Sequence, residues 1–275
     1  MQMSAADSPR LRSVATEAIT IGRQQVRVAV REGDGSRPPL LLLNGIGAVL
    51  EALQPFVDAL PPATGVIRFD IPGVGGSPAP RAPYRLWRMS ALVARLLDEL
   101  GHARADVLGV SWGGALAQQF AFQRHRRCRR LILVSTAAVA GIPPSATVLR
   151  EMMSPRRFED PDHARAVAAR LYGGRARTDP DVVCALQRPP GDRRGYRYQQ
   201  LALVGWTSVP FARFIRQRTL ILTGDDDPIV RPVNGAILHR LIRNAELHVF
   251  DDGHLGLITS AEVLVPRIEE FLERS

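Results

Sequence analysis

The sequence predicts a protein of the α/β class, with a central, mostly parallel β-sheet flanked by helices. Continuous apolar runs such as 39–44 and 130–135 are typical of strands that are covered on both faces. Helix-compatible segments such as 87–100 and 115–122 lie between them, so strands alternate with helices along the chain. The 275 residues are enough to bury a core of this kind.

The first half of the chain contributes three strands and a helix to this expectation. Residues 25–31 alternate in polarity, as a half-buried strand does, whereas 39–44 and 65–70 are more uniformly apolar. A helix is predicted over 87–100 because its leucines and valine recur on one face. Gly101 is expected to end that helix.

The second half continues the alternation of strands and helices. Strands are predicted at 105–108, 130–135, 219–223 and 246–250, and a final amphipathic helix at 261–273. Strands connected through helices imply parallel pairing with right-handed crossovers.

A different pattern occupies residues 141–216. No run there is typical of a buried strand, and short helical stretches are separated by Pro and Gly, as at 189–191. We expect this segment to be a helical cap inserted into a core made of 1–140 and 217–275.

The net charge is +9, and every basic residue is an arginine. The arginines are scattered except at 124–130, where five of seven residues are Arg and one is His. Because this cluster closes the helix at 115–122, where cations interact favourably with the helix dipole, we expect a solvated helix end. No nucleic-acid partner is therefore predicted.

Features of secreted and membrane proteins are not expected. Residues 1–12 contain no apolar signal-peptide core, and the uncharged stretch 131–149 is interrupted by Gly and Pro. Cys128 and Cys184 form no disulfide framework, and neither has neighbours typical of a metal site. We expect a cytoplasmic protein without a membrane span or a bound metal. The sequence contains no signal for a particular oligomeric state.

Residues 109–114 read Gly-Val-Ser-Trp-Gly-Gly and connect a predicted strand to a predicted helix. A G-x-S-x-G pentapeptide in this position is the nucleophile elbow of the α/β-hydrolase fold. The turn forces Ser111 into a strained conformation that presents its hydroxyl, and Gly109 and Gly113 leave room where strand and helix crowd together. Ser111 is the predicted nucleophile.

A serine needs a base to remove its proton, and the base needs a carboxylate to orient it. In this fold the acid and then the histidine follow the serine, each on a loop after a strand. We predict His254 as general base and acid, because it follows the last strand. Asp227 is the predicted orienting acid, since Pro228 favours an extended conformation before it.

Other carboxylates and histidines are assigned structural roles. Asp225 or Asp226 is expected to cap the following turn, and Asp251 and Asp252 are expected to be turn residues. The remaining histidines lie in or next to predicted helices or within a strand (His102, His125, His163, His239 and His248).

An oxyanion formed on the substrate needs fixed N–H donors. One is expected from the backbone of Trp112, directly after the nucleophile. The other is expected from the glycine-rich turn 44–47, through Ile46 or, as the alternative, Gly45. The glycines at 73–76 lack the residues of a phosphate-binding loop, so no nucleotide cofactor is predicted.

Taken together, these motifs resemble those of the intracellular medium-chain-length poly(3-hydroxyalkanoate) depolymerases. The matching segments are 44–47, 72–77, 109–120, 152–158, 172–174, 205–208, 224–228 and 251–255. The resemblance implies hydrolysis of the esters of stored polyester granules to 3-hydroxyalkanoic acids, by the same Ser111, Asp227 and His254. The chain differs from the family in its arginine-only basicity and in the arginine-rich stretch 188–197.

We therefore expect a serine esterase that uses no cofactor and acts on a hydrophobic hydroxyalkanoate polyester or its oligomers. Apolar residues of the cap suit alkyl side chains (Met152, Met153, Phe158, Tyr172, Trp206, Phe211 and Phe214), although most of them are expected to form the cap's own core and about a third to line the pocket. Two alternatives stay open: a general carboxylesterase or lactonase for small acyl substrates, and a granule-surface binding protein that retains the fold.

Overall fold

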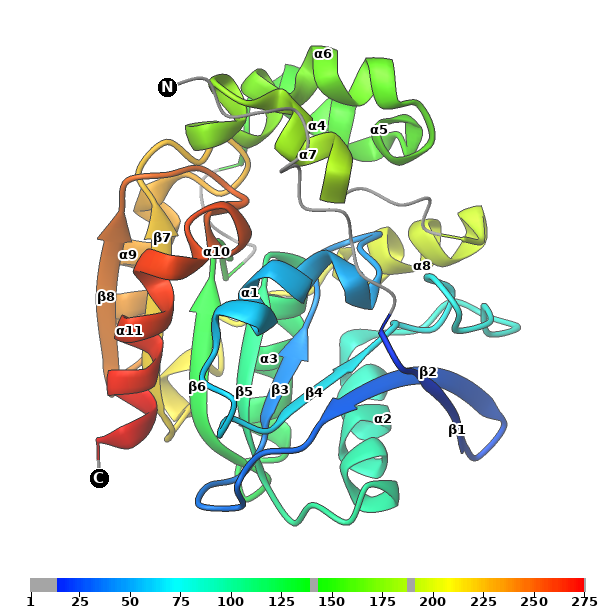
Figure 1. The fold of residues 1–275 in the computed structure, drawn as a ribbon, viewed down its shortest axis with the longest axis vertical. Helices are drawn as coiled ribbons and strands as arrows, with labels where there is room; N and C mark the ends of the chain where they lie inside the picture. The colour runs from blue at the N-terminus through cyan, green and yellow to red at the C-terminus, as the bar shows by residue number, and fades with distance from the viewer. Residues whose placement is uncertain (1–13, 139–142, 187–190, 275) are drawn as a thin grey trace.

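The computed structural model describes residues 14–138, 143–186 and 191–274 (Figure 1). Its strands are β1 (Glu17–Ile21), β2 (Gln24–Arg31), β3 (Leu40–Leu43), β4 (Val66–Phe69), β5 (Ala105–Val110), β6 (Cys128–Val134), β7 (Arg218–Gly224) and β8 (Ala245–Phe250). They form one eight-stranded sheet in the order β1-β2-β4-β3-β5-β6-β7-β8. Strands β3 to β8 run parallel to one another, whereas β2 pairs antiparallel with β1 and β4. The predicted mostly parallel sheet is confirmed.

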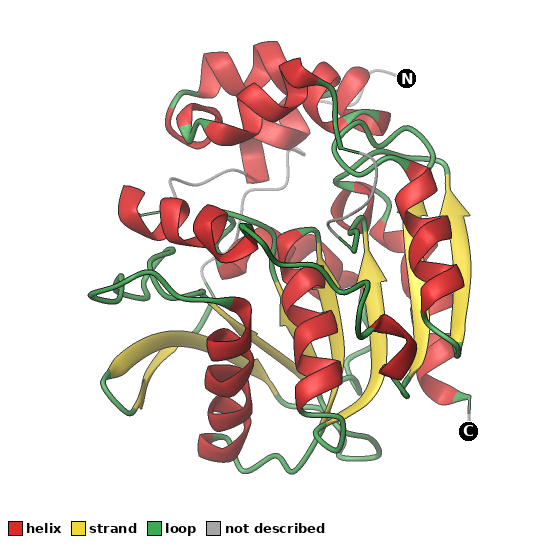
Figure 2. Ribbon diagram, turned by 180° about the vertical axis from the view of Figure 1, so that it is seen from behind, coloured by secondary structure: helices red, strands yellow, loops and turns green. Residues whose placement is uncertain are grey.

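Helices cover both faces of the sheet (Figure 2). One face packs against α2 (Leu86–Glu99), α3 (Trp112–Gln123) and α9 (Pro232–Leu241). The other packs against α1 (Gln54–Ala59), α10 (Gly256–Thr259) and α11 (Ala261–Glu273), with the short 3-10 helix η1 (Leu50–Leu53) leading into α1.

The four leucines of β3 show why an apolar run predicts a central strand. Successive side chains of a strand point to opposite faces of the sheet. Leu40 and Leu42 join the cluster beneath α1 and α11, while Leu41 and Leu43 join the cluster beneath α2 and α3. All four are fully buried, so both faces of β3 need apolar side chains.

Between β6 and β7 the chain forms helices and no strand among the residues that are described there. We call this segment the β6–β7 insertion. It contains α4 (Ala146–Met153), α5 (Arg156–Glu159), α6 (Pro161–Tyr172), η2 (Gly174–Arg177), α7 (Pro180–Leu186), α8 (Arg193–Leu203) and η3 (Ala212–Phe214). Helices α4 to α7 gather beyond the end of the sheet toward which β6, β7 and β8 point (Figure 1). The predicted border at 140/141 and the Pro-Pro step at 189–190 lie outside the described residues.

Some elements differ from their predicted bounds. Helix α11 spans 261–273 as predicted, but α3 begins at Trp112, three residues before the predicted start. The glycines at 113 and 114 made that start hard to predict, because glycine is a poor helix former. Strand β1 and helices α1 and α9 were not predicted; α9 does carry a Pro at its start, which is a common initiation signal.

The arginine cluster at 124–130 is only partly a solvated helix end. Arg124 and Arg126 are exposed, as expected. Arg129, however, forms an ion pair with buried Asp106, and buried Arg130 donates to the carbonyl of Leu272. The solvated assignment is therefore wrong for the second half of the cluster, which ties β6 to its neighbours.

Within the described chain, no helix is both long and apolar enough to cross a membrane. Cys128 is buried at the start of β6. The side chain of Cys184 lies outside the described part, so the absence of a disulfide stays a prediction. Residues 1–12 also lie outside it, and what was expected of them stays a prediction as well.

Candidate active site

The turn from β5 into α3 holds Ser111 in a left-handed backbone conformation, with φ 53° and ψ −115°. Its N–H donates to the carbonyl of Val134 at 2.9 Å, which ties the turn to β6. A Cβ atom on Gly113 would lie 2.0 Å from the carbonyl oxygen of Leu43, and one on Gly109 would lie 2.4 Å from that of Gly113. The strain at Ser111 and the need for both glycines, expected from the sequence, are confirmed.

Asp227 follows β7 and His254 follows β8, and the two side chains meet. Asp227 Oδ2 lies 2.8 Å from His254 Nδ1. Asp227 Oδ1 accepts the backbone N–H groups of Ile229 at 2.9 Å and Val230 at 2.8 Å. The Asp227 side chain is fully buried, so this pair is shielded from solvent.

The glycine-rich turn at 44–47 lies beside Ser111. The Cβ position of Gly45 is 3.7 Å from the Cβ atom of Ser111. The N–H of Gly45 donates to Asn44 Oδ1 at 2.9 Å, so it is already occupied. Across the described residues, the N–H groups of Ile46 and Trp112 find no protein acceptor. This favours Ile46 over the alternative donor Gly45.

Gln199 of α8 contacts both of these segments, and sequence reasoning missed it. Its Oε1 accepts the N–H of Gly47 at 2.8 Å, and its backbone carbonyl accepts the indole N–H of Trp112 at 2.8 Å. Gln199 is fully buried. One residue of the β6–β7 insertion therefore holds the turn that carries Ile46 and the residue after Ser111.

Replacing Gln199 with leucine should lower kcat about tenfold with little change in KM, because donors to an oxyanion act only in the transition state. The substitution removes the acceptor of the Gly47 N–H and keeps the backbone bond to Trp112. Steady-state kinetics on a soluble ester would measure it. Gln200→Leu, next on the same helix, is the matched control and should keep kcat; an unchanged kcat in Gln199→Leu would refute the role.

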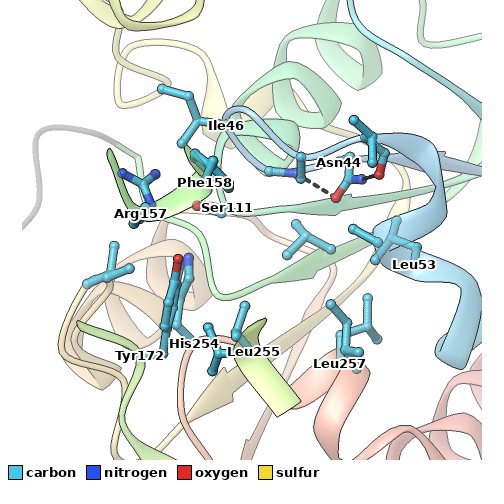
Figure 3. A pocket seen from close by; sticks show the side chains of 18 of the residues that line it. Asn44, Ile46, Leu53, Ser111, Arg157, Phe158, Tyr172, His254, Leu255 and Leu257 are labelled. Carbon is cyan, nitrogen blue, oxygen red and sulfur yellow. Dashed lines mark hydrogen bonds between the residues drawn. The ribbon is translucent and has the colours of Figure 1, made fainter. Parts of the chain in front are cut away.

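Ser111 and His254 line one cavity, which has a volume of about 90 Å³ (Figure 3). Most of its lining is apolar. These apolar residues come from the core, as with Leu53 and Leu257, as well as from the insertion. Among the apolar residues expected to suit the substrate, Met152, Phe158 and Tyr172 line it. The others do not (Met153, Trp206, Phe211 and Phe214).

The turn after α6 docks on the loops that carry Asp227 and His254. The Tyr172 carbonyl accepts the backbone N–H of His254 at 2.7 Å. The N–H of Gly174 donates to Asp226 Oδ2 at 2.7 Å, and Arg177 forms an ion pair with the same carboxylate. Asp226, one of the two aspartates considered for capping the following turn, binds the insertion instead.

Asp252 is more than the turn residue that the sequence suggested. Its side chain accepts the N–H groups of Arg175 at 2.8 Å and Gly253 at 2.6 Å, and the hydroxyls of Thr259 at 2.7 Å and Ser260 at 2.6 Å. Burial raises the pKa of Asp252, but these hydrogen bonds lower it more, so the net pKa lies below the ordinary value. The carboxylate joins the insertion to the loop of His254.

Replacing Asp252 with asparagine should reduce the free energy of unfolding at pH 7 by about 1–3 kcal/mol, because charge-assisted hydrogen bonds are lost. The folded-state pKa lies below the unfolded one, so this stability is present above the unfolded pKa and disappears as pH falls through the folded pKa. Urea unfolding at pH 7 and in acid should show the difference from wild type shrinking. Asp251→Asn, at the exposed neighbour, is the control; equal stabilities of the two variants at pH 7 would contradict the role of Asp252.

Comparisons with known proteins agree with this geometry. The model of the α/β hydrolase fold family matches residues 38–183 and 184–261. The chain is 47% identical over 259 residues to the poly(3-hydroxyalkanoate) depolymerase of Ectopseudomonas oleovorans, covering 93% of this chain and 92% of that protein. It is 26% identical over 244 residues to 3-oxoadipate enol-lactonase 2 of Acinetobacter baylyi, covering 88% and 91% of the two chains. The resemblance noted in the sequence is confirmed.

Solved structures show the same fold. The enol-lactonase from Burkholderia xenovorans superimposes with a TM-score of 0.81 and 25% identity, over 94% of this chain and all of that chain. A hydrolase from Pseudomonas aeruginosa superimposes with a TM-score of 0.80 and 25% identity, over 94% and 98% of the two chains.

Proposed function

Because the chain belongs to the α/β-hydrolase family, we propose that this enzyme is a serine hydrolase that cleaves the ester bonds of poly(3-hydroxyalkanoate) or its oligomers. The products are 3-hydroxyalkanoic acids. The proposal places the enzyme in the cytoplasm, with its substrate on polyester storage granules. Residues 141–216 serve in it as a cap over the core.

In this mechanism Ser111 Oγ attacks the ester carbonyl, and His254 Nε2 accepts the hydroxyl proton. The bond from His254 Nδ1 to Asp227 fixes the ring so that Nε2 is the free basic nitrogen. The N–H groups of Ile46 and Trp112 receive the oxyanion of the tetrahedral intermediate.

The intermediate collapses when the C–O bond of the ester breaks and His254 gives its proton to the departing alkoxide oxygen, which becomes the free hydroxyl of the next polymer unit. The substrate acyl group is then esterified to Ser111. Water attacks this ester, His254 takes a proton from the water, and the second collapse releases the acid and restores Ser111.

The observation that carries this proposal is the joint placement of Ser111 and His254 on one mainly apolar cavity. Each methylene of an alkyl side chain that leaves water there contributes about 0.8 kcal/mol to binding. The 47% identity to a poly(3-hydroxyalkanoate) depolymerase supports the same substrate.

A second candidate is a lactonase or general carboxylesterase for small acyl substrates. The similarity to enol-lactonases in sequence and structure favours it. Incubation with short-chain polyester, medium-chain polyester, a lactone and soluble esters, with the products identified, decides between the two. Release of 3-hydroxy acids from polyester supports the proposal, and turnover of the lactone or soluble esters alone supports the second candidate.

A granule-binding protein without activity is the non-enzyme alternative. A fluorophosphonate probe labels an activated serine covalently, so labelling of Ser111 excludes this alternative. Labelling is expected in the wild-type protein.

A further inference from the structure

Arg157 of α5 is a buried cation on the wall of the candidate active site. It is 4% exposed and lines the same cavity as Ser111 and His254, and Figure 3 shows it alongside Phe158. Among the described residues, no carboxylate lies within ion-pair distance of its guanidinium. Buried Asp106, in contrast, is paired with Arg129. An unpaired buried charge is costly, so the lack of a counter-ion calls for a reason.

The contacts of Arg157 hold the guanidinium in place but do not neutralise it. Nη1 donates to the carbonyls of Glu151 at 3.2 Å, Met152 at 3.4 Å and Ser154 at 3.0 Å. The guanidinium carbon lies 4.4 Å from the centre of the Phe158 ring and 5.6 Å from that of Tyr196. These groups are all neutral, so the guanidinium lacks a negatively charged partner, and a bound anion would supply one. A guanidinium has five N–H donors with which to bind it.

The guanidinium stays charged in this setting. Burial lowers the pKa of Arg157, but the hydroxyls of Tyr172 and Tyr196 raise it more, so its net pKa lies above the ordinary value. A fixed positive charge in a mainly apolar cavity attracts a negative group more strongly than it would in water.

Building on the proposed function, we propose that Arg157 binds the carboxylate of the acid end of a hydroxyalkanoate chain. Every other group of such a chain is an ester, a hydroxyl or an alkyl side chain, so the terminal carboxylate is its only anion. A planar guanidinium fork matches a carboxylate in geometry and charge. The site therefore takes either an oligomer with a free acid end or the released 3-hydroxyalkanoate, and favours cleavage near that end.

The substrate test compares a 3-hydroxyalkanoate oligomer with its methyl ester, in which a methyl group removes the charge of the acid end. The wild-type enzyme should prefer the free acid in kcat/KM. Arg157→Met should lower that preference about 10- to 100-fold while turnover of the methyl ester changes little, and Arg157→Lys should retain part of it. Exposed Arg156→Met is the matched control and should keep the wild-type ratio.

A purely structural Arg157, which only binds the carbonyls at the end of α4, predicts a different result. Its loss would affect the acid and the methyl ester equally, and an unchanged ratio in Arg157→Met would overturn a substrate carboxylate site.

The product test uses the wild-type protein alone and so does not depend on the folding of a variant. Calorimetric binding of a medium-chain 3-hydroxyalkanoate is compared with that of its neutral amide. Tighter binding of the acid, about tenfold or more, supports a site for the released product even if the oligomer shows no preference. Equal binding of acid and amide, with no preference for the acid oligomer, would overturn the proposal.

The two proposals fail separately. Absence of any polyester or oligomer hydrolysis by the wild-type enzyme would refute the proposed function, but binding of the acid would still report on Arg157. Normal hydrolysis without discrimination between acid and neutral ligands would refute only the role of Arg157.

Discussion

Replacing Ser111 with alanine is expected to lower kcat for ester hydrolysis about 10⁴-fold or more, with the fold retained. The hydroxyl is the group that forms the acyl-enzyme, so without it no acyl-enzyme can form. The residual rate would come from substrate binding and the oxyanion donors, which the substitution leaves intact. Alanine also has a Cβ atom, so the backbone strain at φ 53° is unchanged.

Initial rates on a soluble ester and on polyester would measure this loss, and thermal unfolding would establish that the fold persists. Ser135→Ala is a matched control, since Ser135 also has a positive φ, 46°, directly after a strand of the same sheet. Among the described residues its buried hydroxyl has no hydrogen-bond partner, so its removal should leave kcat near wild type. Retention of a tenth or more of the activity in Ser111→Ala would refute the nucleophile assignment.

The candidate catalytic residues could be predicted because their signals are local in the sequence. Gly109 and Gly113 flank Ser111 within one turn, and the structure shows that a Cβ at either position would collide with backbone. Asp227 and His254 each follow directly on an apolar strand. Parallel strands bring such loops to one edge of the sheet, so order along the chain was enough to group the three residues.

The side chains from the insertion could not be predicted, because their roles depend on distant contacts. Gln199 and Gly47 are 152 residues apart, and a polar residue on a short helix carries no sign of its partner. Arg157 stands next to Arg156 in the sequence, yet the first is buried and the second is exposed. Their different burial follows from the packing of α5 against α8 and the cavity. The four hydrogen-bond donors to Asp252 likewise come from a segment that is remote in sequence as well as from its own loop.

Replacing Asp227 with asparagine should lower kcat about 10⁴-fold, although the side chain has the same shape. The structure dictates how the amide would lie. The oxygen that accepts the N–H groups of Ile229 and Val230 must stay an oxygen, because an NH₂ group there would face two donors. The amide NH₂ would therefore point at His254 Nδ1.

An NH₂ group at that position makes Nδ1 of His254 an acceptor, so the proton of the neutral ring moves to Nε2. A protonated Nε2 cannot accept the proton of Ser111, and the base is lost while every heavy atom stays in place. Asp225→Asn, at the exposed carboxylate two residues earlier, should leave kcat unchanged. NMR detection of the ring proton on Nε2 in Asp227→Asn would identify the tautomer directly, and a kcat within tenfold of wild type would contradict the orienting role of Asp227.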